Sequence, residues 1–312
     1  MKKTLIILFT ILAHQGIACI NEYRTLLSGQ VIYTDAISGL PYYKKLNSSE
    51  LLRELSELDS LYKIDNSVKA LSDYGAILIY LGRLDEAIDL YRKIEQQQPS
   101  LYATAANTGT AFELLGHIDS ASFYIQKAIN INPNSHHGSE WIHLKILKAK
   151  KDILTNREYL RNTSILGLDF GREGKPTDPK NLNLTVLEAQ IRFQLSERMT
   201  FVKAPDLIVG QLLFDLGNIC ALTTDVQAAL ECYKLSKEYG YSSDLLDERI
   251  STLEPLAHKA TLASSTEKIA IRNPILSLII IAVAGLGFVW VGMKVIKRIR
   301  KKSAGANTGY RS

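Results

Sequence analysis

Residues 68–101 read VKALSDYGAILIYLGRLDEAIDLYRKIEQQQPSL, and residues 102–135 read YATAANTGTAFELLGHIDSASFYIQKAININPNS. The two windows match in register at an offset of 34 residues. Seven positions are identical, whereas average composition gives about two by chance. The identical pairs are Gly75 and Gly109, Leu81 and Leu115, Gly82 and Gly116, Asp85 and Asp119, Ala87 and Ala121, Lys93 and Lys127, and Pro99 and Pro133. The chain therefore contains an internal repeat.

Each window has the pattern of two helices. In the first, Leu71, Tyr74, Leu78 and Leu81 recur at helical spacing, and Gly82 ends that helix before a second apolar stripe begins. Neither helix can bury its apolar face alone, so neighbouring hairpins must stack. The pattern predicts an elongated solenoid of antiparallel helix pairs.

These windows resemble the tetratricopeptide repeat (TPR), whose consensus has small residues at its eighth, twentieth and twenty-seventh positions, an aromatic at the twenty-fourth and a proline at the thirty-second. The matching residues are Gly75, Ala87, Tyr91 and Pro99 in the first window and Gly109, Ala121, Ala128 and Pro133 in the second. Ile94 and Ile125 depart from the consensus but remain apolar. The resemblance implies that the glycine and alanine lie where the paired helices touch.

A third unit is predicted at Gly210–Ser243, with Gly217, Ala229 and Tyr233 at the eighth, twentieth and twenty-fourth positions and Tyr241 in place of the proline. The predicted organisation is a signal peptide (1–18), a helical cap (19–67), two repeats (68–135), a divergent helical segment with the loop 166–183 (136–209), the third repeat with a capping helix (210–259), a polar tether (260–273), a transmembrane helix (274–293) and a basic tail (294–312). The fold class is all-α: a TPR-like α-solenoid plus one C-terminal transmembrane helix.

The two ends of the chain predict its location. Lys2 and Lys3 precede an apolar stretch and the small residues Gly16 and Ala18, which is typical of a secretory signal peptide. Residues 275–293 carry no charge and as a helix would span about 28 Å, close to the ~30 Å bilayer core. Six basic residues lie within 294–302, which places the C-terminus in the cytoplasm and the repeats on the periplasmic side of the inner membrane.

The net charge of +5 is unevenly distributed. The signal segment carries +2 and the residues from Pro274 onward carry +7, which leaves −4 for the body between them. A weakly acidic body gives no reason to expect nucleic acid as a partner. The basic tail is instead expected to lie against anionic lipid.

The resemblance also implies a partner-binding groove, because the first helices of successive TPR hairpins line a concave face. The expected groove residues are Lys69, Asp73, Tyr80, Asn107 and Thr110, with Trp141 as a further anchor. This mixed polar and aromatic set suits a helix or an extended peptide of a partner protein. Packing of Trp141 in the core is the alternative for that residue.

Motifs for catalysis are absent from the sequence, and we expect no cofactor and no catalytic residue. His136, Glu140 and His143 lie within two helical turns, and Glu140 with His143 has the Glu-x-x-His spacing of di-iron bundles. A single copy makes a polar helix start the preferred interpretation. A metal-dependent enzyme at this cluster is the less favoured alternative.

Three cysteines are too few for a disulfide scaffold. Cys220 and Cys232 fall on the facing helices of the third unit, where either buried thiols or a disulfide is possible. Cys19 would follow the cleavage site, as lipidation requires, but Gly16 and Ile17 make a poor lipobox.

The sequence thus predicts a membrane-anchored scaffold whose repeats bind another protein. A structural spacer within the cell envelope is the second hypothesis, because a solenoid also sets a fixed distance. The sequence names neither the partner, the pathway nor the oligomeric state.

Overall fold

A computed structural model describes residues 22–25, 27, 31–34, 40–41, 47–156, 159–162 and 164–272. The predicted signal peptide, transmembrane helix and basic tail lie outside these residues. The chain divides into two compact units, Met1–Ala257 and His258–Ser312, and the packing below is that of the first. Within the described ranges no helix has the length and apolarity needed to cross a membrane.

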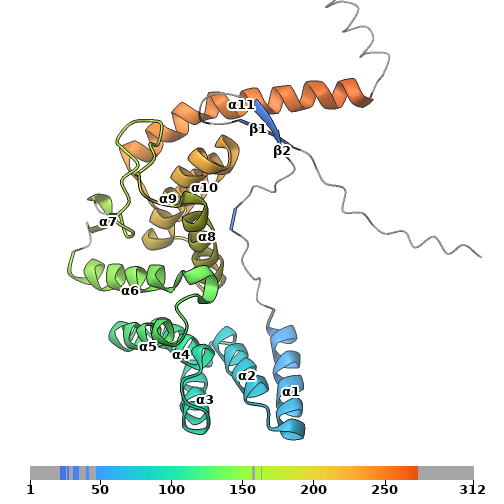
Figure 1. The fold of residues 1–312 in the computed structure, drawn as a ribbon, viewed down its shortest axis with the longest axis vertical. Helices are drawn as coiled ribbons and strands as arrows, with labels where there is room; N and C mark the ends of the chain where they lie inside the picture. The colour runs from blue at the N-terminus through green and yellow to red at the C-terminus, as the bar shows by residue number, and fades with distance from the viewer. Residues whose placement is uncertain are drawn as a thin grey trace, which may run out of the picture. The chain divides into compact units, whose positions relative to one another are not determined.

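Helices make up most of the described structure (Figure 1). The elements in chain order are β1 (Glu22–Thr25), β2 (Val31–Thr34), α1 (Ser48–Asp65), α2 (Val68–Tyr80), α3 (Leu84–Gln97), α4 (Tyr102–Leu114), α5 (Ile118–Ile131), η1 (Ser135–Gly138), α6 (Glu140–Thr155), α7 (Tyr159–Asn162), α8 (Leu184–Phe201), α9 (Leu207–Thr223), α10 (Val226–Glu238) and α11 (Asp244–Arg272). The three predicted helix pairs are α2 with α3, α4 with α5, and α9 with α10.

Glycine turns connect the helices of the first two pairs. Gly82 has φ +75° and Gly116 has φ +82°, a region that residues with a Cβ rarely adopt. Pro99 and Pro133 are exposed just beyond the ends of α3 and α5, where proline cannot continue a helix. These residues set where each helix of the repeat stops.

A second set of glycines lets the paired helices approach closely. A Cβ on Gly75 would lie 2.6 Å from the Tyr91 ring, and one on Gly109 would lie 2.6 Å from Ile125. A Cβ on Gly217 would likewise overlap Tyr233. The predicted small residues Ala87, Ala121, Ala128 and Ala229 are all fully buried. The eighth and twenty-fourth positions of each repeat are therefore in direct contact.

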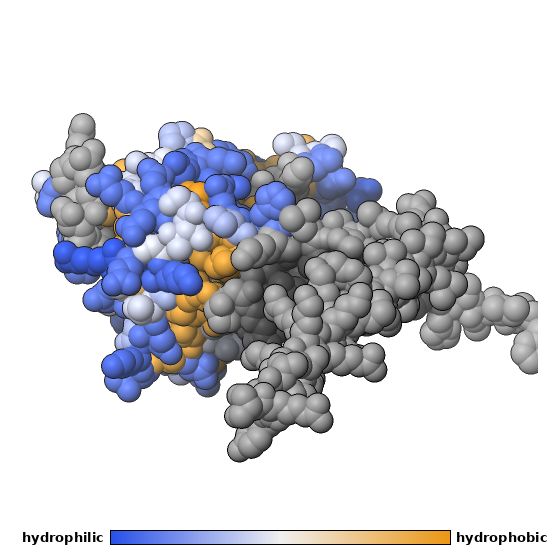
Figure 2. Space-filling model, turned by 90° about the horizontal axis from the view of Figure 1, so that it is seen from above, coloured by the Kyte–Doolittle hydropathy of each residue, from blue (hydrophilic) through white to orange (hydrophobic). Residues whose placement is uncertain are grey.

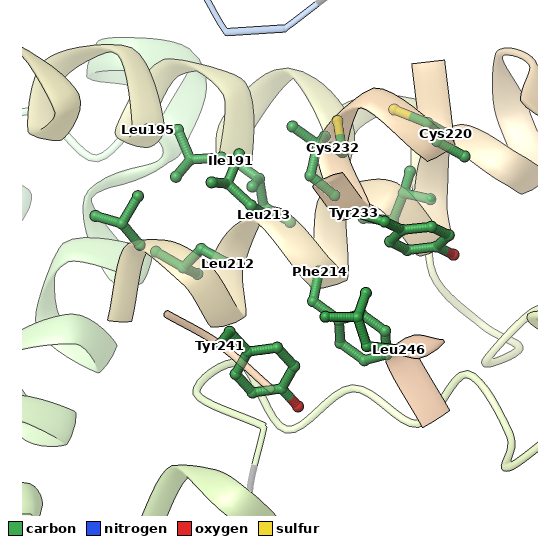
Figure 3. Packing of buried hydrophobic residues seen from close by; sticks show 14 of the residues in the cluster. Ile191, Leu195, Leu212, Leu213, Phe214, Cys220, Cys232, Tyr233, Tyr241 and Leu246 are labelled. Carbon is green, nitrogen blue, oxygen red and sulfur yellow. The ribbon is translucent and has the colours of Figure 1, made fainter. Parts of the chain in front are cut away.

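The buried apolar residues form separate clusters. One joins α1 to the first repeats through residues such as Leu51, Ile77 and Tyr91. The largest lies in the C-terminal half of the unit, where Phe214, Tyr233 and further residues of α8 to α11 pack together (Figure 3). Separate cores are what a repeat architecture predicts, because each layer contacts mainly its neighbours.

Helix α8 belongs firmly to the C-terminal core. Its stripe of Leu187, Ile191, Leu195 and Met199 is 6% exposed or less. At about 1.5–3 kcal/mol for each fully buried side chain, this stripe contributes roughly 6–12 kcal/mol to holding α8 in place. Leu184, at the start of the helix, is only partly buried.

The long loop before α8 is held by a buried arginine of α11. Arg249 is 0% exposed and donates from Nη2 to the carbonyls of Phe170 at 3.0 Å and Gly171 at 2.7 Å. It also contacts the Asn218 side chain and lies 5.2 Å from the centre of the Phe214 ring. A loop without hydrophobic periodicity is thus fixed by hydrogen bonds to its backbone.

Two predicted segments differ from the structure. Residues 19–67 were expected to be a helical cap, but β1 and β2 form an antiparallel pair within it, with Tyr23 opposite Tyr33. Their threonine, tyrosine, valine and isoleucine residues favour strands. The expected tether is also helical, since α11 continues to Arg272. Residues 260–272 contain no glycine or proline to stop it.

The close approach in the third repeat predicts the effect of a single methyl group. Alanine at Gly217 should destabilise the protein by about 1–3 kcal/mol, because the Tyr233 ring is fully buried and cannot move aside. Helix propensity alone would predict the opposite sign. Urea unfolding of Gly217→Ala, Tyr233→Leu and the double variant measures this. Additive losses in the double variant would contradict a direct contact.

Candidate functional site

The predicted groove residues of the first repeat lie on α2. Lys69 and Asp73 are exposed on its first half. Tyr80, at its end, is half-buried and stacks on Phe201 of α8, with the ring centres 5.4 Å apart and the planes 8° from parallel. The expected groove is therefore exposed at Lys69 and Asp73, whereas at Tyr80 it is in contact with α8.

Asn107 and Thr110 continue this face on α4. Asn107 donates from Nδ2 to the hydroxyl of Tyr91 at 2.8 Å, and that hydroxyl donates to the carbonyl of Ser72 at 2.9 Å. The Thr110 hydroxyl donates to the carbonyl of Ala106 at 3.2 Å. Asn107 thus ties the second repeat to the first, which the sequence analysis did not anticipate.

A hollow lies between α4 and α8 and is open to solvent. Its walls carry aromatic, aliphatic and polar side chains from both helices: Ala106, Asn107, Thr110, Leu114, Phe193, Glu197 and Phe201. Its floor is formed by charged residues of α4, α6 and α8. Two of the predicted groove residues, Asn107 and Thr110, are brought together there.

Glu113 of α4 is the centre of that charged floor. Its carboxylate lies 2.5 Å from Arg198 Nη1, 2.6 Å from His143 Nε2 and 2.6 Å from Lys150 Nζ. Glu113, Arg198 and His143 are each less than 10% exposed. Three helices are joined through one buried carboxylate.

The electrostatics of this cluster favour its charged state. Burial acts to raise the pKa of Glu113, but the neighbouring charges of Arg198 and His143 outweigh it, and the pKa lies well below its usual range. Burial acts to lower the pKa of His143, but the Glu113 carboxylate raises it above 6.5. The Glu113 carboxylate therefore favours the imidazolium form of His143.

The predicted trio of His136, Glu140 and His143 does come together, but as a hydrogen-bonded network. Glu140 Oε1 lies 2.8 Å from His136 Nδ1 and accepts from the hydroxyl of Tyr102 at 2.6 Å, while its Oε2 lies 3.4 Å from His143 Nδ1. Because Nε2 of His143 faces Glu113 and Nδ1 faces Glu140, both nitrogens of the ring already lie against carboxylates. The described residues hold no group of three such side chains placed to bind a metal ion.

Trp141 lies beside α8 and does not line the hollow. Its indole Nε1 donates to Gln190 Oε1 at 3.1 Å, and its ring packs on the C-terminal core. Trp141 therefore packs against the core, which is the alternative given for this residue, and it is only partly buried.

Cys220 and Cys232 are both buried free thiols on α9 and α10. Arg192 Nη2 lies 3.1 Å from Cys220 Sγ. Hydrogen bonding to Cys232 and burial raise the pKa of the Cys220 thiol, which keeps it neutral. Cys19 lies outside the described residues.

Sequence reasoning missed Glu113, Arg198 and the position of α8. A signal was available: Glu113 lies between apolar residues near the end of α4, and His143 occupies the position that glycine fills in the other repeats. A glycine there admits a second helix, as at Gly109, whereas the element that comes directly after α6 is the four-residue α7. The histidine side chain reaches Glu113 instead.

His143 predicts a loss of stability at alkaline pH. Its folded-state pKa lies above the unfolded value of about 6.5, so its contribution is complete below that pH and is lost as the pH rises through the folded value. Above about pH 6.5 His143 should make the free energy of unfolding fall as the pH rises, by at most about 1.4 kcal/mol per unit for this one group. His143→Gln should make this slope shallower in urea titrations, and the part that remains is that of Asp215.

A second buried group still titrates at the lower end of this pH range. Burial raises the pKa of Asp215 to about 7, despite hydrogen bonds from Gln211 and Ser164, so this carboxyl also lowers stability as the pH rises from about 4 to 7. Glu95→Gln is the matched control, because it breaks an ion pair with Lys127 that lies outside the cluster. An unchanged slope in His143→Gln would exclude the imidazolium as its source.

Comparison with known proteins supports the repeat family. Residues 106–135 match the family model of the tetratricopeptide repeat. No curated protein matches the chain. A TPR protein of known structure from Parabacteroides merdae is 12% identical over 66% of this chain and 93% of its own, with a TM-score of 0.29.

A second structural match is a chain in the structure of Naa15/Naa10 bound to HypK-THB. It is 19% identical over 73% of this chain and 35% of its own, with a TM-score of 0.30. At these scores the superpositions carry no detail about this chain. The match at residues 106–135, which covers most of α4 and α5, supports the TPR family for the repeats that the glycine and alanine positions predicted.

Proposed function

We propose that this protein is a non-enzymatic scaffold that binds another protein along the inner face of its repeats. By inner face we mean the face formed by the first helices of the pairs, α2 and α4. The observation that carries the proposal is the open hollow beside α4, whose walls combine aromatic, aliphatic and amide side chains. Such a mixture suits recognition of a peptide, with apolar contacts for affinity and a few polar groups for orientation. The exposed Lys69 and Asp73 extend this face beyond the hollow.

Large hydrophobic residues reach the surface of the described part of the chain at scattered positions, such as Leu52, Phe123 and Leu154. Figure 2 shows a face on which hydrophilic residues predominate and hydrophobic residues gather in a narrow band. Scattered surface apolar residues need no explanation, but contiguous ones often mark contact sites.

The charged groups at the hollow support binding in preference to catalysis. Glu113 is paired with Arg198, His143 and Lys150, and Oε1 of Glu140 is engaged by His136 and Tyr102. A catalytic acid or base needs a free edge toward its substrate. We therefore assign this cluster a structural role.

Export and membrane attachment complete the proposal. The signal-like residues 1–18 and the uncharged residues 275–293 support a scaffold on the periplasmic side of the inner membrane, with the basic tail in the cytoplasm. Anchoring would keep a weakly binding scaffold near partners in the same membrane, which raises their effective concentration.

A photo-crosslinking amino acid tests the binding face. Placed at Asp73, on the inner face, it should give a defined adduct with a partner protein in intact cells. The matched control is Asp89, which is also exposed but lies on α3, the second helix of the same pair. Gel analysis and mass spectrometry identify the adduct. Equal adducts from both positions, or none from either, would sink the proposal.

Reporter fusions test the topology. A reporter that is active only outside the cytoplasm should be inactive after Ser312 and active after Ala263, which precedes the uncharged segment. Equal expression is checked by immunoblot. Activity after Ser312 would reverse the orientation, and activity after neither position would remove export from the proposal.

A further inference from the structure

The two helices of the third repeat bring a pair of cysteines onto touching faces. A Cβ on Gly217 of α9 would lie 2.4 Å from the Tyr233 ring of α10 and 3.2 Å from the carbonyl oxygen of Ala229. Residues three positions apart share a face of a helix. Cys220 follows Gly217 by three residues, and Cys232 follows Ala229 by three. Both thiols therefore lie on the faces through which α9 and α10 meet.

The two thiols are buried and adjacent. Cys220 and Cys232 are each 0% exposed, and a hydrogen bond joins their side chains. Figure 3 shows the two sulfur atoms pointing toward one another from α9 and α10. Two cysteines whose side chains point apart cannot be bridged without movement of the backbone. This pair meets the geometric requirement for a disulfide.

Helix α8 covers the pair. Arg192 Nη2 lies 3.1 Å from Cys220 Sγ, and Cys220 Sγ donates to Glu188 Oε1 at 3.8 Å. Arg192 and Glu188 are themselves paired at 2.9 Å. Hydrogen bonding to Cys232 and burial raise the pKa of the Cys220 thiol, whereas the thiolate is the form that attacks a disulfide. The folded chain therefore shields these sulfur atoms from oxidants and reductants alike.

The short separation of the cysteines offers a stage at which they can react. Twelve positions separate Cys220 from Cys232, and both belong to one helix pair. A loop of this length closes rapidly, so the thiols can meet as soon as α9 and α10 pair. The covering residues of α8 come from a more distant part of the chain. A thiol oxidant can act in this interval, and disulfides persist outside the cytoplasm.

We propose that Cys220 and Cys232 are an oxidation site, which a disulfide-bearing oxidant converts during folding to an intramolecular disulfide that locks α9 to α10 beneath α8. One cysteine loses its proton, attacks the oxidant disulfide and displaces one thiolate. The other loses its proton, attacks the sulfur of the mixed disulfide and displaces the second thiolate. Two electrons and two protons leave the pair, and the oxidant is reduced to two thiols. The inference rests on the exported location within the proposed function.

Oxidative refolding of the purified full chain in detergent tests the pair. The reduced, denatured chain is refolded with oxidised glutathione, denatured again and alkylated. Trypsin then releases residues 204–234, which carry both cysteines and no internal cleavage site. We expect this peptide to be free of alkyl groups and lighter than the reduced peptide by two hydrogen atoms. A peptide that carries two alkyl groups, or two glutathiones, would overturn the inference.

The single variants Cys220→Ala and Cys232→Ala are the controls. Each leaves one thiol in the peptide, which should take up one alkyl group or one glutathione and form no internal bond. Cys19 lies on a different tryptic peptide, so its reactions do not alter this reading. A mass lower by two hydrogen atoms in either variant would assign the loss to another reaction and remove the support for the pair.

Reduction of the oxidised chain tests the cover. Dithiothreitol should reduce the bond at least about tenfold more slowly in buffer than in urea, because α8 must first move away. The alkylated peptide at successive times gives both rates. Equal rates would contradict the placement of the bond beneath α8.

The redox state in cells separates this inference from the proposed location. Chains alkylated in denaturant directly from intact cells should contain the bond. If the thiols are free in cells while the reporter after Ala263 is active, the exported chain escapes oxidation and the inference is overturned. If the thiols are free and that reporter is inactive, the proposed location fails, whereas a bond formed on refolding still supports the pair.

Discussion

The arrangement of the helices around the hollow depends on the buried carboxylate of Glu113. A carboxylate removed from water costs several kcal/mol unless opposite charges and hydrogen bonds compensate it. Here the compensation comes from His143 and Lys150 of α6 and from Arg198 of α8. The cost of leaving Glu113 unpaired therefore favours only those structures in which α4, α6 and α8 converge. Apolar packing stabilises each core, but this contact selects how they meet.

The same contact changes what the repeats can bind. In an open solenoid, the first helices present a continuous concave face to a partner. Because Arg198 holds α8 against α4, and Phe201 stacks on Tyr80, this face is divided. One part becomes the hollow lined by Thr110, and the other remains as the exposed start of α2. The divergent segment between the repeats thus shapes the site as much as the repeats do.

The sequence predicted the contacts that form within one hairpin and missed those that join distant parts of the chain. Gly75 and Gly109 act within one hairpin, and their spacing marks both the helix pairs and their contact. The Glu113–Arg198 pair joins residues 85 positions apart, and no local pattern reveals such a partner. The strand pair and the helical course of residues 260–272 were missed for a different reason: short segments with mixed propensity fit more than one local structure.

Buried polar contacts recur wherever the chain departs from the repeat. The loop before α8 has no apolar period to place it, and Arg249 holds it through the carbonyls of Phe170 and Gly171. Hydrophobic contacts are not directional, so many placements of an irregular segment bury similar area. A guanidinium hydrogen-bonded to two particular carbonyls is satisfied in very few of them. In the repeats a glycine against a large side chain fixes the geometry; between them, a buried charge performs that role.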